Sequence, residues 1–263
     1  MSGFSADWLA LREPVDHGSI NAEVRRRFCD AMPRGERLRL VDIGCGTGSN
    51  MRGLSHWLGS AQHWTLFDYD AGLLTHASES ATSLGLAHDI RHANLASADL
   101  APLFKGAHAI TSAAFFDLAS QPAVDRIAEA AANARAVFYT VLTYDGIASW
   151  LPETTAANGL RTGFNRHQSG DKGLGPALGP RATDALSTAF QSHGYRVITG
   201  PSPWVITGAH SRLRNELDRG WASAAVQAGG LSQKDAEAWL NARLSDPSAI
   251  TVVGHQDLLA LPA

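Results

Sequence analysis

Apolar runs and helical repeats alternate along the first 145 residues of the chain. Short apolar stretches bounded by turn residues predict buried strands at 38–43, 63–70, 88–95, 108–118 and 135–144. Segments with helical periodicity lie between them, such as residues 71–85 and 122–134. Strands separated by helices imply right-handed crossovers and a parallel sheet. The pattern therefore predicts a doubly wound α/β domain.

Two segments outside this regular part carry different patterns. Residues 1–32 are predicted to be helical, because Ile20, Val24 and Phe28 recur at a spacing of four. Residues 146–180 contain seven glycines and three prolines, so one regular element is not expected there. A loop of that length in a compact domain favours a lid or a substrate loop over a plain connection.

The remaining residues, 181–263, return to helices and strands, with strands expected at 195–206 and 249–261 and a helical pair between them. A chain of 263 residues can form one large core, so residues 1–263 are interpreted as a single domain. The formal net charge of −3 and the 18% of charged residues give no basic face for nucleic acid. A small-molecule partner is therefore expected.

Targeting and redox signals favour the cytoplasm. The two cysteines, Cys29 and Cys45, form neither a C-x-x-C pair nor a disulfide framework, which fits a reducing compartment. The first 18 residues lack the basic and apolar regions of a leader, and no long apolar stretch follows. We expect a soluble, cytoplasmic protein with no membrane partner and no metal site.

Three glycines, Gly44, Gly46 and Gly48, follow directly after the first predicted strand. Ordering glycine is entropically costly, so this spacing indicates a main chain that turns tightly or approaches a ligand closely. In an open parallel sheet the ligand lies beyond the carboxyl ends of the strands, where this turn stands. Asp68 follows Gly48 by twenty residues, the spacing at which a carboxylate reaches ribose hydroxyls bound over the turn. Ser49 stands where the dinucleotide fingerprint requires its third glycine, which disfavours a nicotinamide cofactor.

The segments "VDIGCGTG" (41–48) and "WTLFDYD" (64–70) together resemble the first two motifs of class I S-adenosylmethionine-dependent methyltransferases. The resemblance covers residues 38–145 as a cofactor-binding core and extends loosely to the two closing strands. It implies a Rossmann-like fold, with a doubly wound, mostly parallel seven-stranded sheet, helices on both faces and the last strand antiparallel. It also implies S-adenosyl-L-methionine as cofactor and S-adenosyl-L-homocysteine as product.

The same resemblance assigns cofactor contacts residue by residue. It places the glycine turn against the methionine and ribose parts, Asp68 on the ribose hydroxyls, and Tyr69 with Asp70 beside the adenine. Asn94 replaces the family's Asp at the third strand, and its oxygen can still accept from the adenine amino group. The residues expected to bind the cofactor are Arg12, Asp42, Gly44, Cys45, Gly46, Gly48, Asp68, Tyr69, Asp70, Asn94, Leu95, Ser112 and Ala113.

Three residues are candidates for the chemical step. His167 is a candidate general base, since a neutral imidazole can take the proton of an attacking nucleophile; a solvated loop histidine is the alternative. Asp171 lies in the same polar segment, and Asp117 follows the fourth strand, where it borders the substrate pocket or caps the next helix. Arg12 is expected to pair with the methionine carboxylate or to be an exposed helix charge. Cys45 is interpreted as a small turn residue and not as a nucleophile.

Together these patterns predict methyl transfer from S-adenosylmethionine to a small-molecule acceptor, with residues 1–32 and 146–180 as lids. Such transfer needs chiefly positioning and desolvation, so no fixed catalytic triad is expected. A protein that binds S-adenosylmethionine for lyase or hydrolase chemistry, or without transfer, is an open alternative. A nicotinamide-dependent oxidoreductase is the less favoured one.

Overall fold

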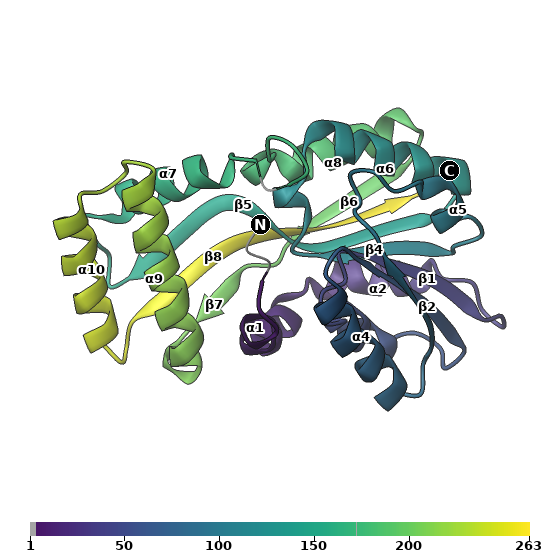
Figure 1. Cartoon of the computed structure of the whole chain (residues 1–263), viewed down its shortest axis with the longest axis horizontal. Coiled ribbons are helices and arrows are strands. Elements are labelled where there is room, and N and C mark those ends of the chain that lie inside the picture. Colours follow the sequence, from purple (N-terminus) through teal and green to yellow (C-terminus); the bar gives the residue numbers. More distant parts are fainter. Residues whose placement is uncertain (1–3, 172) are drawn as a thin grey trace.

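The computed structural model describes residues 4–171 and 173–263, which form an eight-stranded sheet (Figure 1). The path through the sheet is β3 (Ala87–His92), β2 (Gln62–Asp68), β1 (Leu38–Ile43), β4 (Ala109–Ala113), β5 (Val137–Leu151), β8 (Ile250–Leu261) and β6 (Arg196–Pro201). The short strand β7 (Trp204–Ile206) also pairs with β8. Strands β1 to β5 are parallel, whereas β8 is antiparallel to β5, β6 and β7.

Helices cover both faces of the sheet, because successive residues of a strand point to opposite sides. Leu40 of β1 belongs to one core cluster and its neighbour Val41 to the other. The first cluster packs beneath α1 (Ala6–Ser19), α2 (Ala22–Asp30), α3 (Ser49–Ser55) and α4 (Ala71–Ser83). The second packs beneath α5 (Leu100–Phe104), α6 (Gln121–Ala134) and α8 (Ala182–Ser192). The predicted doubly wound, mostly parallel sheet with an antiparallel closing strand is confirmed.

The strand order reverses between β1 and β4. From β1 the chain continues to β2 and β3 on one side, and it returns to β4 and β5 on the other. The connections after β1 and β4 therefore diverge, which leaves the crevice where open α/β sheets bind their ligands. The glycine turn that follows β1 stands at this crevice.

Strands β5 and β8 extend beyond the parallel part of the sheet. Their far ends are covered by α7 (Ala157–Gln168), α9 (Ser211–Gln227) and α10 (Gln233–Ser245), on the left in Figure 1. Aromatic rings fill the space between: Phe164 stacks on Trp221 with centroids 3.8 Å apart, and Trp150 meets Trp221 edge to face at 5.2 Å. This packing gives the extension an apolar core of its own.

Residues 146–180 were expected to form a loop, but their first part holds the end of β5 and all of α7. A Cβ at Gly163 would lie 2.7 Å from Cα of Ala225, and one at Gly159 would lie 2.5 Å from the carbonyl oxygen of Gly230. These glycines therefore allow α7 to pack closely against α9 and the residues after it. They do not interrupt the helix.

The strand predicted at 195–206 is divided into β6 and β7. The sheet therefore has eight strands and not the seven that were predicted. β6 pairs with residues 256–261 of β8, and β7 pairs with residues 251–253. Between the two strands, the backbone N–H of Ser202 donates to the carbonyl of His255 at 2.8 Å. The described residues also form the 3₁₀ helices η1 (Phe116–Leu118), η2 (Gly179–Arg181) and η3 (Gly208–His210). None of the described helices combines the length and hydropathy that a membrane span requires.

Candidate active site

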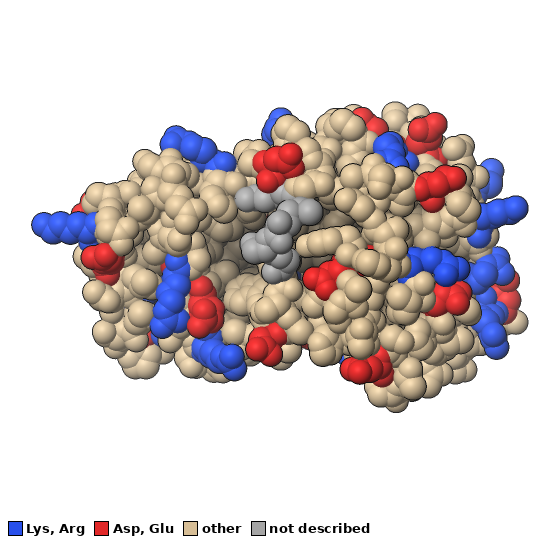
Figure 2. Space-filling model, viewed as in Figure 1, with Lys and Arg blue, Asp and Glu red and all other residues tan. Residues whose placement is uncertain are grey.

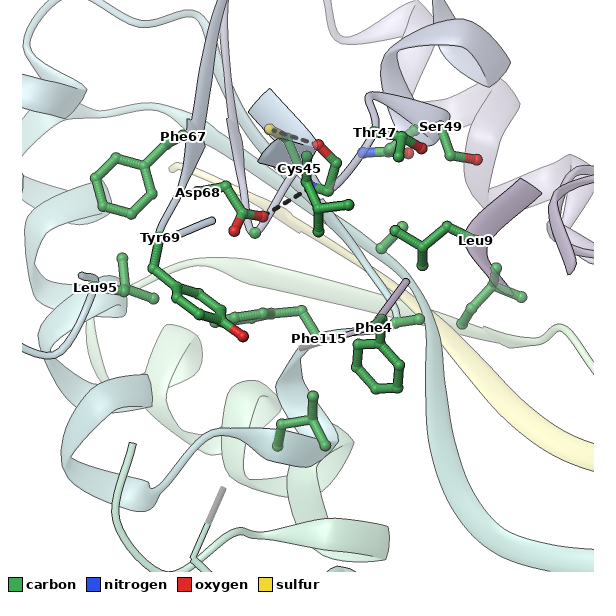
Figure 3. Close-up of a pocket in the computed structure, with 18 of the residues that line it drawn as sticks. Phe4, Leu9, Cys45, Thr47, Ser49, Phe67, Asp68, Tyr69, Leu95 and Phe115 are labelled. Carbon is green, nitrogen blue, oxygen red and sulfur yellow. Dashed lines mark hydrogen bonds between the residues drawn. The ribbon is translucent and has the colours of Figure 1, made fainter. Parts of the chain in front are cut away.

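A cavity of about 380 Å³ opens where β1, β2 and β4 end, beneath α1. That volume lies within the usual range for cofactor and small-molecule sites. Figure 3 shows side chains from the glycine turn, from the end of β2 and from α1 around this space. The predicted cofactor residues that line it are Arg12, Gly44, Cys45, Gly46, Asp68, Tyr69, Asn94, Leu95 and Ala113.

The glycine turn needs glycine for both conformation and space. Gly44, Gly46 and Gly48 have φ angles of 63°, 53° and 81°, a left-handed region that residues with side chains disfavour. A Cβ at Gly44 would lie 2.6 Å from the ring of Phe115, and one at Gly46 would lie 3.2 Å from Cδ1 of Leu9. Gly48 begins α3 and packs against α4, outside the lining of the cavity. The two earlier glycines therefore bring bare backbone to the cavity.

Asp68 ends β2 with its carboxylate beside the glycine turn (Figure 3). It is 6% exposed, and its Oδ2 accepts from the backbone N–H of Gly46 at 2.8 Å while Oδ1 accepts from that of Asp70 at 3.0 Å. Each oxygen keeps a further lone pair for a ligand donor. Tyr69 and Leu95 present apolar surface at the same end of the cavity. A carboxylate beside flat apolar surface suits hydroxyl groups joined to an aromatic ring system.

Helix α1 forms another wall of the cavity. Leu9, Arg12 and Asp16 lie on one helix face at spacings of three and four, with Ile20 following at the end, and all four line the cavity. Of these four residues, only Arg12 was predicted from the sequence. The helical spacing of the other three is the signal that could have identified them.

Arg12 and Asp16 form a buried pair at this wall. Nε and Nη2 of Arg12 donate to the two carboxylate oxygens of Asp16 at 2.8 and 3.1 Å. The guanidinium also lies 4.8 Å from the centroid of the Trp204 ring. Burial raises the pKa of Asp16, and the Arg12 guanidinium opposes that rise. Arg12 is therefore not an exposed helix charge.

Two further contacts anchor α1 over the cavity. Nε2 of His17 lies 3.0 Å from the carbonyl oxygen of Ser49, which can only accept, so this nitrogen carries the proton. Nε of Arg52 donates to Glu13 at 2.8 Å. Burial raises the pKa of Glu13, but the Arg52 guanidinium outweighs it and the net pKa lies below the ordinary value. α1 is therefore bonded to α3, the helix that follows the glycine turn.

Asp42, predicted among the cofactor contacts, lies behind the lining of the cavity. It is almost fully buried, and its Oδ1 accepts from Nδ2 of Asn50 at 2.8 Å and from Oγ1 of Thr111 at 2.7 Å. Burial raises the pKa of Asp42 to about 6, and the two hydrogen bonds only partly offset this. Its observed contacts join β1, β4 and α3 beneath the glycine turn.

Ser112 and Asp70 also lie outside the lining. Oγ of Ser112 donates to the carbonyl of Ile43 at 2.9 Å, between β4 and β1, and the next residue, Ala113, faces the cavity instead. Asp70 caps α4, where its Oδ1 accepts from two backbone N–H groups of the first turn at 2.8 and 3.0 Å. Both side chains form hydrogen bonds within the fold, and their sequence neighbours Ala113 and Tyr69 border the cavity instead.

The polar segment around His167 and Asp171 is divided between two places. His167 lies on α7, outside the lining of the cavity. Asp171 lines the cavity, and its Oδ1 accepts from the backbone N–H of Gly173 at 2.7 Å, which fixes the turn that it begins. Lys172 lies outside the described residues. The segment was predicted as one polar loop, but α7 ends at Gln168, so His167 belongs to the helix and Asp171 follows it.

Asp117 is buried in η1 with 8% of its surface exposed. Phe115 and Leu118, on either side of it in the sequence, both line the cavity. Burial raises the pKa of Asp117 to about 6, and the Arg12 guanidinium only partly offsets this. A carboxyl group with that pKa is mostly ionised at neutral pH and can accept a proton. It does not cap α6, whose N-cap is Ser120.

A strained wall of the cavity was not foreseen from the sequence. Leu142, in an irregularity of β5, has a φ of 58°, and its backbone N–H donates to Oδ1 of Asp257 at 2.9 Å. Oδ2 of the same carboxylate accepts from the N–H of Asn21, the N-cap of α2, at 2.7 Å. Asp257 therefore joins the start of α2 to the cavity wall. Its sequence signal was the single acidic residue of β8.

Residues 40–136 match the model of the methyltransferase domain family. This match spans the parallel part of the sheet, from within β1 to the residue before β5, and includes the glycine turn and Asp68. S-adenosylmethionine is the cofactor of this family. No curated protein is significantly similar to the chain in sequence.

Solved structures of similar fold include several methyltransferases. The cyclopropane synthase MmaA2 from Mycobacterium tuberculosis is 14% identical, with a TM-score of 0.54 over 98% of this chain and 94% of that one. A putative methyltransferase from Bacillus halodurans is 11% identical, with a TM-score of 0.54 over 92% of this chain and all of that one. The YcgJ protein from Bacillus subtilis is 14% identical, with a TM-score of 0.53. At these identities the likeness shows the fold.

Proposed function

We propose that the protein transfers a methyl group from S-adenosylmethionine to a small-molecule acceptor. The observation that carries the proposal is a single cavity with two unlike ends. One end offers the Asp68 carboxylate, the backbone of Gly46 and the surfaces of Tyr69 and Leu95. The other is bordered by α1, by Phe115 and by the segment that begins at Asp171.

The first end fits the cofactor in the kinds of groups it presents. Asp68 would accept from ribose hydroxyls, Asn94 and Leu95 would border the adenine, and the glycine backbone would lie against the methionine part. When bound, S-adenosylmethionine supplies a methyl group on a positively charged sulfur. The apolar walls and the anchored helix α1 exclude water from the space beside that group.

Among the predicted catalytic residues, Asp117 is the proton acceptor that we favour. It stands between the lining residues Phe115 and Leu118 in the sequence, and its pKa of about 6 leaves it ionised at neutral pH. Asp171 has one oxygen engaged in its own turn, and His167 belongs to α7 outside the lining. We assign these two residues to the positioning of the segment that borders the acceptor.

The experiment is transfer of labelled methyl groups from S-adenosylmethionine to a metabolite extract, after calorimetry has shown that S-adenosylhomocysteine binds. We expect both binding and a labelled product. Binding with breakdown of the cofactor and no labelled acceptor would favour lyase or hydrolase chemistry. Binding of a nicotinamide cofactor in place of S-adenosylhomocysteine would refute methyl transfer.

A further inference from the structure

Strand β5 contains a bulge at the cavity. Val141 and Leu142 stand opposite the single residue Asp257 of β8, and both line the cavity. β5 pairs with β4 as far as Val141, so the bulge lies where β5 leaves the parallel part of the sheet and enters the extension. In Figure 2 the visible face is hollowed near its middle, between these two parts of the molecule. Bulges are common next to active sites, where they redirect the chain.

The bulge carries backbone strain. Leu142 has a φ of 58°, and Ala114, directly after β4, has a φ of 49°. The third described residue other than glycine with a positive φ is Arg135, the C-cap of α6, where helices often end in this conformation. The backbone N–H of Ala114 donates to the carbonyl of Val141 at 2.9 Å, and both strained residues line the cavity. Such strain persists only where the surrounding structure holds it, and it clusters at functional sites.

The carboxylate of Asp257 holds the strained residue of the bulge. Its Oδ1 accepts from the backbone N–H of Leu142 at 2.9 Å, and its Oδ2 accepts from that of Asn21 at 2.7 Å. Leu142 has no paired residue in β8, and a buried N–H without an acceptor is costly. The fully buried carboxylate therefore bridges the bulge to the start of α2.

The bulge lies away from the end of the cavity that we assign to the cofactor. β1 and β4 separate β5 from β2, and neighbouring strands lie about 4.8 Å apart, so Leu142 stands about 14 Å across the sheet from the strand that ends at Asp68. Phe115, which borders the acceptor end, directly follows the strained residue Ala114. The two strained residues therefore belong to the wall of the acceptor end.

We propose that Asp257 is a positioning residue for methyl transfer, which holds the left-handed backbone of Leu142 as a wall of the acceptor end. This inference rests on the proposed function. Asp257 is not among the described residues that line the cavity, so it acts through Leu142. Transfer requires the acceptor atom and the methyl group to be aligned in contact, and a displacement of about 1 Å can lower the rate about a hundredfold. A wall that shifts when the bridge is broken therefore slows transfer.

The experiment removes the bridge and measures binding and transfer separately. Asp257→Ala removes both acceptor oxygens, and Asp257→Asn turns one of them into a donor, so neither variant can accept from both N–H groups. We expect the rate of labelled methyl transfer from S-adenosylmethionine into a metabolite extract to fall by about tenfold or more. Calorimetry should show an unchanged affinity for S-adenosylhomocysteine. A wild-type rate in a variant that circular dichroism shows to be folded overturns the inference, and so does an equal loss of cofactor affinity.

A second change assigns the effect to the left-handed residue. In the folded Asp257 variant, Leu142→Gly supplies a residue that adopts a φ of 58° without strain, so it should restore the transfer rate by about fivefold or more. Leu142→Ala shortens the side chain almost as far but keeps the Cβ that disfavours this φ, so it should restore none of the rate. Equal recovery with both, or no recovery with glycine, would show a merely structural role and overturn the inference.

A control separates positioning from a general loss of stability. Asp218→Asn changes another fully buried carboxylate, which pairs with Arg243 in the extension and lies outside the lining. It should lower stability and leave both the transfer rate and the affinity for S-adenosylhomocysteine unchanged in the folded protein. A rate loss like that of the Asp257 variants would attribute their effect to destabilisation and overturn the inference. Failure of the wild-type protein to bind S-adenosylhomocysteine or to form a labelled product would instead refute the proposed function.

Discussion

Asp68→Ala tests the cofactor end of the cavity most directly. The carboxylate is 6% exposed and is held at the cavity by the N–H groups of Gly46 and Asp70, at 2.8 and 3.0 Å. A hydrogen bond to a charged group contributes about 1.5–3 kcal/mol. Since about 1.4 kcal/mol corresponds to a factor of ten, losing one such bond to a ribose hydroxyl should weaken S-adenosylhomocysteine binding roughly ten- to a hundredfold.

Calorimetry with S-adenosylhomocysteine measures this loss, and circular dichroism shows whether the variant is folded. Asp70→Ala is the matched control, because Asp70 is two residues away, caps α4 and lies outside the lining. It should cost about 1 kcal/mol of stability, as the loss of an N-cap does, without a change in affinity. A folded Asp68→Ala protein with the wild-type dissociation constant, or an equal loss of affinity in both variants, would refute the reasoning.

Two further substitutions test the residues around the turn. Gly46→Val places a branched side chain at a φ of 53° and against Leu9, so we expect a cooperative melt with no rise in Tm on adding S-adenosylhomocysteine; an unfolded variant would show that the fold alone requires this glycine. Burial raises the pKa of Asp42 to about 6, so its stabilising contribution is present below about pH 4 and is lost as the pH rises through about 6. Asp42→Asn should therefore raise the free energy of unfolding by up to about 3 kcal/mol near pH ~8 and by little near pH ~4; denaturant titrations with equal differences at both pH values would contradict this.

The order of the core elements could be predicted because it depends on local patterns. Apolar runs such as residues 38–43 and helical repeats such as residues 71–85 are visible within a few turns of chain, and the crossover rule then orders the strands. The same reasoning failed for α7. Gly159 and Gly163 are unfavourable in an isolated helix, and only the close approach of α9 and the residues after it explains why they are there.

The placement of the glycine turn and Asp68 at the cavity was predictable for a related reason. The glycine turn and Asp68 belong to one strand–turn–helix–strand unit, so their relative positions follow from local geometry. Local geometry does not say which side chains the fold itself uses. Asp42 and Asp70 are as acidic as Asp68, yet one joins buried elements and the other caps a helix.

The sequence by itself determined the doubly wound core and the turn at its switch point, because both follow from the periodicity and backbone preferences of neighbouring residues. Only the tertiary structure decided how α1 covers the cavity and how its wall is held. Asp257 binds the N–H groups of Asn21 and Leu142, which lie 236 and 115 residues before it. Whether a carboxyl group such as Asp117 is buried, and whether it meets a counterion, depends on segments that meet only in the folded chain. No local pattern specifies those neighbours, and they set the pKa of the buried carboxyl group.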